Sequence, residues 1–154
     1  MNDDLYHEAI VRLARDATGR GRLDAADGRA TVDNPLCGDR VTVEVAIADG
    51  HIAAVGHQTR GCVLCEAAAA VIGQGAPGAT PSSIDESAAT LQAILSGGNA
   101  EATGRWAALA AFRPVAAKRS RHDCVRLPFT ALREAMAQAT EQATRSTRGA
   151  AGSR

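Results

Sequence analysis

Alternating apolar and polar residues mark the middle of the chain. From Val41 to Ile47 every second residue is apolar, which is the pattern of a strand that buries one face. Asp49-Gly50 follows and favours a two-residue hairpin turn. We therefore expect an antiparallel returning strand over residues 51–59 and a third strand near it.

Apolar residues at three- and four-residue steps predict helices on both sides of this sheet. The first helix covers residues 5–17 and is capped by Asp3 or Asp4. A polar, turn-rich stretch follows it and runs to about Asn34. After Cys62 an alanine-rich run predicts a second helix, so this cysteine lies at or near a helix N-terminus.

Further helices are expected in the second half of the chain. Ser83 and Glu86 have capping-box spacing and predict a helix from near residue 82 to Leu95. A short helix over residues 106–112 precedes a basic loop, and a long final helix follows with Pro128 in its first turn. The apolar stripe of that final helix comprises Phe129, Leu132, Met136, Ala139 and Ala143.

These elements indicate the α+β class: a small antiparallel sheet of about three strands packed against several helices. The length of 154 residues suits one domain with a core of its own. We place this domain at residues 1–145 and expect residues 146–154, which lack periodicity, to form a flexible C-terminal tail.

Composition narrows the class of protein. Hydrophobic residues make up 45% of the chain and the formal net charge is zero, which argues against disorder. The N-terminal residues lack the pattern of a secretory signal, and no apolar run has the length of a membrane helix. A cytoplasmic setting is expected, in which four cysteines indicate reduced thiols with metal-binding or reactive roles.

Positive charge is concentrated near the C-terminus. From Arg113 onward the chain has nine Lys or Arg and three Asp or Glu. Aromatic residues make up only 3% of the chain, and no stacking platform accompanies the basic residues. We therefore expect neither a nucleic acid nor a membrane as partner.

Cys37 and Asp39 are the first candidate metal ligands. They lie in the turn-forming segment Asn34-Pro-Leu-Cys-Gly-Asp-Arg40, just before the alternating strand. Gly38 between them lets the backbone bend, so that a thiol and a carboxylate can point at a common centre.

Cys62 and Cys124 are the second and third candidate thiols. Each lies at or just before the start of an expected helix, where amide donors and the helix dipole favour a thiolate. Lys118, Arg119 and Arg121 precede Cys124. The alternative for either cysteine, taken alone, is a small buried core residue.

Taken together, these motifs resemble the NifU/IscU/SufU family of iron-sulfur cluster assembly scaffolds. The resemblance rests on Asn-Pro-x-Cys-Gly-Asp before a hairpin, Gly61-Cys62 before an alanine-rich helix, and Cys124 near the final helix. The long interval between Cys62 and Cys124 is similar to the SufU branch. The segment ahead of Cys124 also lacks the Leu-Pro-Pro-Val-Lys motif of IscU, and no histidine directly precedes this cysteine.

The resemblance implies a site and a partner. Cys37, Asp39, Cys62 and Cys124 would hold zinc, as in SufU-type proteins, or a transient [2Fe-2S] cluster, as in scaffolds. Cys37 would accept persulfide sulfur from a SufS-like cysteine desulfurase, and downstream assembly or acceptor proteins would receive the product. Arg121 matches an arginine of SufU-type members.

Three functions remain open at this point. They are a SufU-like zinc protein that accepts sulfur, an IscU/NifU-like scaffold that assembles and hands on a [2Fe-2S] cluster, and a purely structural zinc protein. The carboxylate ligand counts against the third, because structural zinc sites mostly use Cys and His. The chain is expected to be at most a zinc-dependent sulfurtransferase-type accessory protein and otherwise a non-enzymatic scaffold.

Auxiliary candidates lie close to the predicted ligands. Cys65 departs from the family pattern and lies one helical turn after Cys62, as a spare ligand, a sulfur relay, a redox partner or a packed core residue. His122, two residues before Cys124, is a candidate for reaching the metal or relaying a proton. Arg40, Arg121 and Arg126 are candidates for balancing the charge of the site, or for ordinary surface charge.

Overall fold

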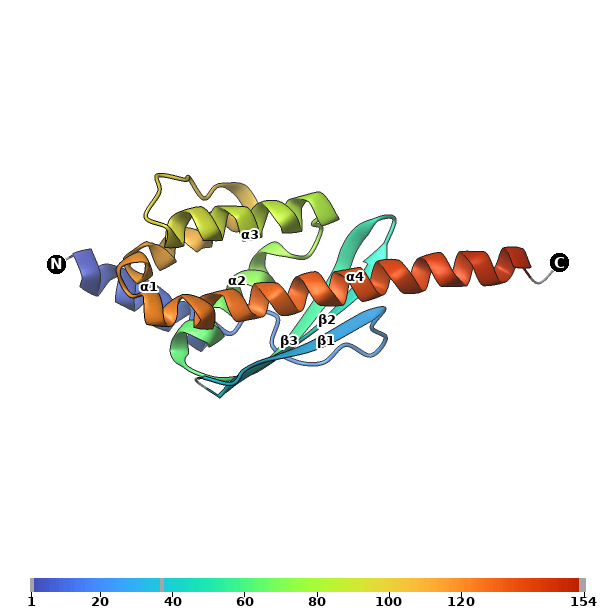
Figure 1. Cartoon of the computed structure of the whole chain (residues 1–154), viewed down its shortest axis with the longest axis horizontal. Coiled ribbons are helices and arrows are strands. Elements are labelled where there is room, and N and C mark those ends of the chain that lie inside the picture. The colour runs from blue at the N-terminus through green and yellow to red at the C-terminus, as the bar shows by residue number, and fades with distance from the viewer. Residues whose placement is uncertain (1, 37, 153–154) are drawn as a thin grey trace.

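The computed structural model describes the backbone of residues 2–36 and 38–152 and the side chains of residues 8–36 and 38–143. A three-stranded sheet lies against a group of helices, and the long final helix runs across both (Figure 1). The helices are α1 (Asn2–Asp16), α2 (Val63–Gly75), α3 (Pro81–Leu95) and α4 (His122–Gly152), with 3-10 segments η1 (Gly104–Ala117) and η2 (Arg119–Arg121). The strands are β1 (Gly28–Asn34), β2 (Asp39–Ala48) and β3 (His51–Arg60).

The sheet confirms the expected α+β class. Strand β2 is central and pairs antiparallel with β1 and with β3. At the β2–β3 turn Asp49 and Gly50 have φ angles of 54° and 77°, the left-handed conformation that a tight hairpin turn requires. The predicted hairpin is therefore confirmed.

The third strand of the sheet lies in a segment that we expected to be turn-rich. Residues 28–34 form β1, which pairs with β2 beside the hairpin, so the expectation of a turn-rich stretch up to residue 34 is wrong. The face of β1 that points toward α4 has no room for a side chain at Gly28, because a Cβ atom there would lie 2.0 Å from the carbonyl oxygen of Ala135. Close approach of α4, rather than a long apolar pattern, holds this strand in place.

The core lies between the sheet and the helices. Helix α4 packs on β1 and β2, and α2 packs against α1 and α4. Val41, Val43 and Val45 project from β2 into this layer and are completely buried. The alanines of α2 are also completely buried, and their small side chains let the neighbouring helices approach closely.

Several expected helix starts are wrong by a few residues. Helix α1 begins at Asn2, ahead of the expected Asp3 or Asp4 cap. Helix α3 is capped by Thr80, whose hydroxyl accepts a hydrogen bond from the Ser83 amide, and Pro81 takes the first helical position. A side-chain cap with a proline behind it thus replaces the expected capping box at Ser83.

The final helix begins earlier than expected. The expected basic loop holds the 3-10 turn η2, and α4 follows it directly at His122. Cys124 therefore lies in the first turn of α4, and Pro128 lies inside the helix rather than in its first turn. Segment 106–112, expected as a short helix, is part of the longer η1.

The C-terminal end of α4 extends beyond the sheet (Figure 1). The helix continues to Gly152, so residues 146–152 are helical although their sequence lacks periodicity. The division of the chain at residue 145 stays a prediction. No helix in the described part of the chain combines the length and the apolar character that crossing a lipid bilayer requires.

Candidate metal centre

Asp39, Cys62 and Cys124 converge at one end of the sheet. One carboxylate oxygen and the two sulfur atoms all lie within 4.8 Å of one another. Asp39 and Cys124 are buried, with 4% and 3% of their surfaces exposed, whereas Cys62 is half-buried. The three groups come from distant parts of the chain, so the fold brings them together as the sequence predicted.

The two cysteines are positioned by helix N-termini. Cys62 is the N-cap residue of α2, and its side chain makes no capping hydrogen bond with the helix. Cys124 occupies the first turn of α4. Both helices therefore direct the positive end of their dipoles toward the site, which stabilises the negative charge that thiolate and carboxylate ligands carry.

Asp39 is held by the residue it faces. It is the first residue of β2, and its Oδ1 atom accepts a hydrogen bond from the backbone N–H of Cys62 at 3.2 Å. Its Oδ2 atom lies 3.8 Å from the Cys62 sulfur and accepts a hydrogen bond from that thiol. Asp39 and Cys62 thus form one unit that joins the start of β2 to the start of α2.

Gly61 makes room for the Asp39 carboxylate. A Cβ atom at this position would lie 2.7 Å from Asp39 Oδ1 and 2.8 Å from Asp39 Cγ, closer than side chains pack. In the sequence, Gly61 is predicted only as part of the Gly61-Cys62 motif. A glycine directly before a predicted ligand is visible in the sequence. The steric role of Gly61 depends on the fold and could not be predicted.

Cys37 lies outside the described residues, so its predicted place in the site stays a prediction. The residues around it form the β1–β2 turn. The Gly38 amide donates to the carbonyl of Asn34 at 2.8 Å, and Gly38 has a φ angle of 75°, as a bend between two ligands requires. The turn leads directly into Asp39.

Cys65 lies apart from the three converging candidate ligands. It is completely buried on α2 and belongs to the hydrophobic core cluster. The group of potential ligands in the described part of the chain does not include it. Its surroundings favour the packed-residue interpretation over a role as a spare ligand.

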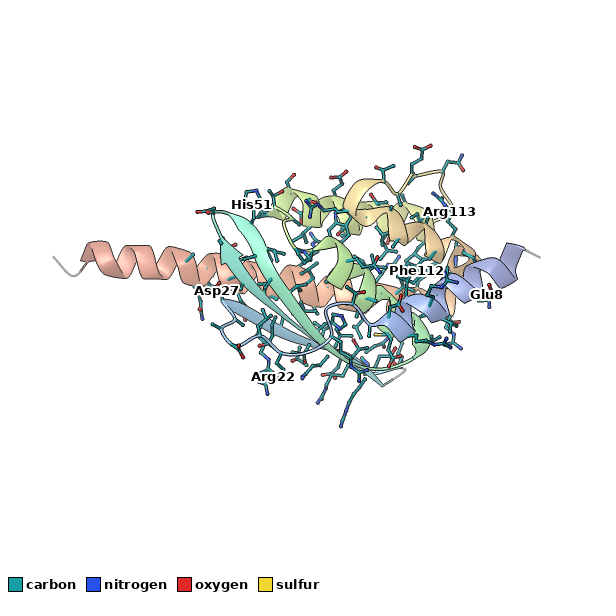
Figure 2. All side chains as sticks on the ribbon, turned by 180° about the vertical axis from the view of Figure 1, so that it is seen from behind. Glu8, Arg22, Asp27, His51, Phe112 and Arg113 are labelled. Atoms are coloured by element: carbon teal, nitrogen blue, oxygen red, sulfur yellow. The ribbon has the colours of Figure 1, made fainter. Side chains whose placement is uncertain are left out.

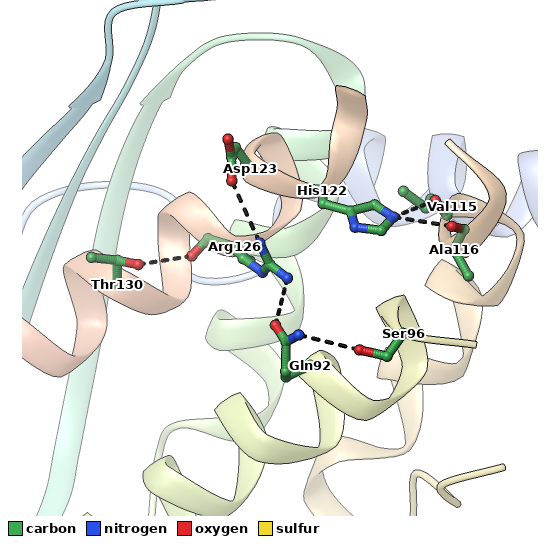
Figure 3. Close-up of polar contacts among 8 residues, drawn as sticks. All are labelled: Gln92, Ser96, Val115, Ala116, His122, Asp123, Arg126 and Thr130. Atoms are coloured by element: carbon green, nitrogen blue, oxygen red, sulfur yellow. Dashed lines mark hydrogen bonds and ion pairs between the residues drawn. The ribbon is translucent and has the colours of Figure 1, made fainter. Parts of the chain in front are cut away.

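His122 faces away from the candidate metal ligands. Its Nε2 atom lies 3.0 Å from the Val115 carbonyl oxygen and 3.2 Å from that of Ala116, so Nε2–H donates to the end of η1 (Figure 3). His122 does not belong to the group of converging ligands in the described residues. This contact ties the start of α4 to η1 and so fixes the turn that carries Cys124.

Two of the three candidate arginines have other partners. Arg40 pairs with Asp33 at 2.6 Å, and this contact raises the pKa of the guanidinium. Arg126 lies 3.6 Å from Asp123 and donates to the Gln92 side chain (Figure 3). Arg121 is exposed in η2, and its role stays a prediction.

The donor set fits a thiophilic metal ion. Around a tetrahedral zinc ion, neighbouring sulfur atoms lie about 3.8 Å apart, given Zn–S bonds of about 2.3 Å. The observed spread of up to 4.8 Å is close to that arrangement. Thiolates suit zinc and iron-sulfur centres, and a single carboxylate makes a harder, more exchangeable ligand among them.

A protein-family model matches more than half of the chain. The family described as NifU-like N terminal domain matches residues 5–96, which is more than half of the chain. The chain belongs to this family. The matched segment contains Asp39, Cys62 and the whole sheet, whereas Cys124 lies beyond it.

Curated relatives match part of this NifU-like chain. The iron-sulfur cluster assembly scaffold protein IscU 1 of Archaeoglobus fulgidus is 30% identical over 76 residues, which are 49% of this chain and 50% of the relative. The scaffold protein IscU of Thermotoga maritima is 32% identical over 68 residues, 44% of this chain and 48% of the relative. The chain spans about half the length of the curated relatives it matches.

Solved structures match almost the whole NifU-like chain. A nitrogen-fixing NifU-like protein (N-terminal) from Brucella abortus has a TM-score of 0.84 and 31% identity, covering 92% of this chain and 98% of that one. A SUF-system scaffold protein, SufU, from Fervidobacterium islandicum has a TM-score of 0.76 and 22% identity, covering 83% and 93%. The second likeness shows a shared fold.

Proposed function

We propose that this protein works in iron-sulfur cluster assembly as a SufU-like zinc protein that accepts sulfur from a cysteine desulfurase. The convergence of Asp39, Cys62 and Cys124 within 4.8 Å is the observation that supports this proposal most directly. Cys37, two residues before Asp39, completes the proposed ligand set. Membership of the NifU-like family supports the same assignment.

Bound zinc would hold the thiols as thiolates and fix their positions. The chain's own groups would prepare the site. The Cys62 amide orients the Asp39 carboxylate, and the helix N-termini at Cys62 and Cys124 offset the charge of the ligands. Burial of Asp39 and Cys124 leaves Cys62 as the more exposed of the three groups.

In the proposed transfer, the Cys37 thiolate attacks the outer sulfur atom of a persulfide on the desulfurase. A new sulfur–sulfur bond forms on Cys37, the sulfur–sulfur bond of the enzyme persulfide breaks, and the enzyme cysteine leaves as a thiolate. No external oxidant or reductant is needed, because the two sides exchange one sulfur atom at the same oxidation level. Acceptor proteins would receive the sulfur next.

The IscU/NifU-like scaffold is the second candidate. The curated relatives are named as iron-sulfur cluster assembly scaffold proteins, and three thiols with one carboxylate also suit a cluster. The SufU-like assignment is favoured by the long interval between Cys62 and Cys124, which holds both α3 and η1. A cytoplasmic location follows from the proposed role.

Mass spectrometry tests the sulfur-acceptor role. After incubation with a cysteine desulfurase and cysteine, the protein should carry extra sulfur on a peptide containing Cys37. Cys65→Ala should accept the same amount, since Cys65 lies in the core away from the site. Persistence of the added sulfur in Cys37→Ala would overturn the assignment. A brown, cluster-bearing protein after anaerobic reconstitution, without persulfide formation, would favour the scaffold instead.

A further inference from the structure

Three arginines surround a hollow on the outer face of the sheet. The hollow has a volume of about 400 Å³ and is lined by Arg20, Arg40 and Arg60 together with Gly21, Thr42, Gln58 and Thr59. We call it the arginine hollow. Arg40 and Arg60 lie directly opposite each other on β2 and β3, and Thr42 and Gln58 form the next pair on the same face.

The third arginine is fixed in place by the backbone. Residues 19–21 run beside β3, where the Gly21 amide donates to the His57 carbonyl at 2.9 Å and the His57 amide donates to the Gly19 carbonyl at 3.2 Å. Gly56 permits this approach, because a Cβ atom there would lie 2.6 Å from the Gly21 oxygen. Arg20 is therefore positioned by the fold.

Two of the three arginines that line the arginine hollow carry positive charge that no ion pair in the described part of the chain balances. Asp33 pairs with Arg40, but no carboxylate in the described part of the chain forms an ion pair with Arg20 or Arg60. Glu44 is directed to the Leu23 amide, to which it is hydrogen-bonded. Like charges directly opposite each other on neighbouring strands destabilise a sheet, and bound carboxylates would relieve that cost.

The arginine hollow lies near the same end of the sheet as the metal centre, on the opposite face. Arg40 follows Asp39 on β2, where successive side chains point to opposite faces, and Arg60 lies two residues before Cys62. Figure 2 shows the back of the molecule, with Arg22, from the same connection as Arg20, on the side of the sheet away from α3. A protein that reached the metal centre at the end of the sheet would therefore also lie beside these positive charges.

Exposed apolar side chains lie next to the predicted ligands. The large apolar residues that are exposed in the described part of the chain are Leu36 and Val63, at 91% and 39%. Each is the direct neighbour of a predicted thiol ligand, Cys37 or Cys62. An apolar contact flanked by charges is the usual composition of a protein–protein interface.

We propose that the arginine hollow docks a carboxylate-rich surface of the protein that exchanges sulfur at the metal centre, with Leu36 and Val63 making the apolar contact beside it. The partner's identity as a cysteine desulfurase rests on the proposed function, whereas the preference for acidic groups rests on the arginines. Charges at the rim of an interface mainly accelerate association, so the effect should depend strongly on salt.

Binding of the organism's cysteine desulfurase, measured at about 50 mM and about 500 mM salt, tests the proposal. Arg60→Gln should weaken binding about 2- to 5-fold at low salt, and Arg20→Gln/Arg60→Gln about 10-fold, with differences shrinking at high salt. The control Arg15→Gln/Arg133→Gln removes the same charge from exposed positions on α1 and α4 and should bind like the wild type. Equal affinity of both double variants would overturn the proposal.

A peptide-binding experiment distinguishes failure of the docking proposal from failure of the proposed function. A fluorescein-labelled peptide of six glutamates should bind the wild type more tightly than Arg20→Gln/Arg60→Gln, and a glutamine peptide should show no difference. If the desulfurase does not bind at all while this dependence on arginine remains, the proposed function fails and the acidic preference of the arginine hollow stands. If the glutamate peptide binds both proteins equally, the docking proposal fails.

Discussion

Replacing Gly61 with alanine should weaken zinc binding at the metal centre without unfolding the protein. The added methyl group would lie 2.7 Å from Asp39 Oδ1, where ordinary contact begins at 3.4 Å, so the carboxylate must move by several tenths of an ångström. The atoms in the way belong to one side chain, so the backbone does not have to shift. Asp39 would instead lose its hydrogen bond from the Cys62 amide.

The size of the effect follows from that lost contact. A hydrogen bond to a charged group stabilises by about 1.5–3 kcal/mol. Groups that orient a metal ligand typically contribute about 10- to 100-fold in metal affinity. We therefore expect Gly61→Ala to bind zinc about 10- to 100-fold more weakly, as measured by competition with a chromophoric chelator.

A matched glycine provides the control. Gly98→Ala would place a methyl group 3.1 Å from the Ala93 carbonyl oxygen, a milder contact outside the metal centre, and its zinc affinity should equal that of the wild type. Urea unfolding in excess chelator checks that both metal-free variants remain folded. If folded Gly61→Ala bound zinc within about 2-fold of wild type, the described coupling between Asp39 and Cys62 would be refuted.

Further predictions concern buried residues of the core. Cys65→Ala should lower the free energy of unfolding by about 1 kcal/mol and leave the metal content unchanged, whereas loss of metal would make Cys65 a ligand. Gly73→Ala should cost about 3 kcal/mol in urea unfolding, because its Cβ atom would meet the Thr18 carbonyl oxygen, while exposed Gln74→Ala should cost little. Between about pH 7.5 and about pH 5, the free energy of unfolding should fall less steeply in His57→Gln than in the wild type. An equal dependence on pH in both proteins would contradict this prediction.

The sign of the His57 prediction comes from burial. Burial lowers the pKa of His57 below the ordinary value of 6.5, nearby Arg20 lowers it further, and the contact with the Thr18 carbonyl opposes them. The unfolded chain therefore takes up a proton more readily than the folded one as the pH falls through that value. Stability is lost on acidification, and removing the imidazole removes this part of the loss.

Much of the fold could be predicted because its strongest elements carry local patterns. The alternation from Val41 to Ile47 and the Asp49-Gly50 turn predict the β2–β3 hairpin correctly. Strand β1 has no comparable pattern, since β2 on one edge and α4 on one face supply its contacts. Such a strand is determined by tertiary contacts and cannot be predicted from a single sequence.

The candidate site, like the fold, could be predicted only in part. The convergence of Asp39, Cys62 and Cys124 could be predicted from motifs, because a metal accepts few types of ligand residue. Their role as metal ligands stays a prediction. The sequence did not predict that Gly61 leaves space for the Asp39 carboxylate, or that the Cys62 amide donates a hydrogen bond to Asp39. Both features arise where the start of β2 meets the start of α2. The arginine hollow was missed for the same reason, because Arg20, Arg40 and Arg60 are far apart in the chain.

X-ray absorption at the zinc edge tests the central claim that these residues hold one metal ion. The zinc-loaded protein should show a mixed shell with sulfur at about 2.3 Å and oxygen at about 2.0–2.2 Å. Cys62→Ser and Cys124→Ser should each lower the sulfur contribution, and Asp39→Ala should lower the oxygen contribution. A zinc shell without sulfur, or one that none of these substitutions alters, would contradict the account.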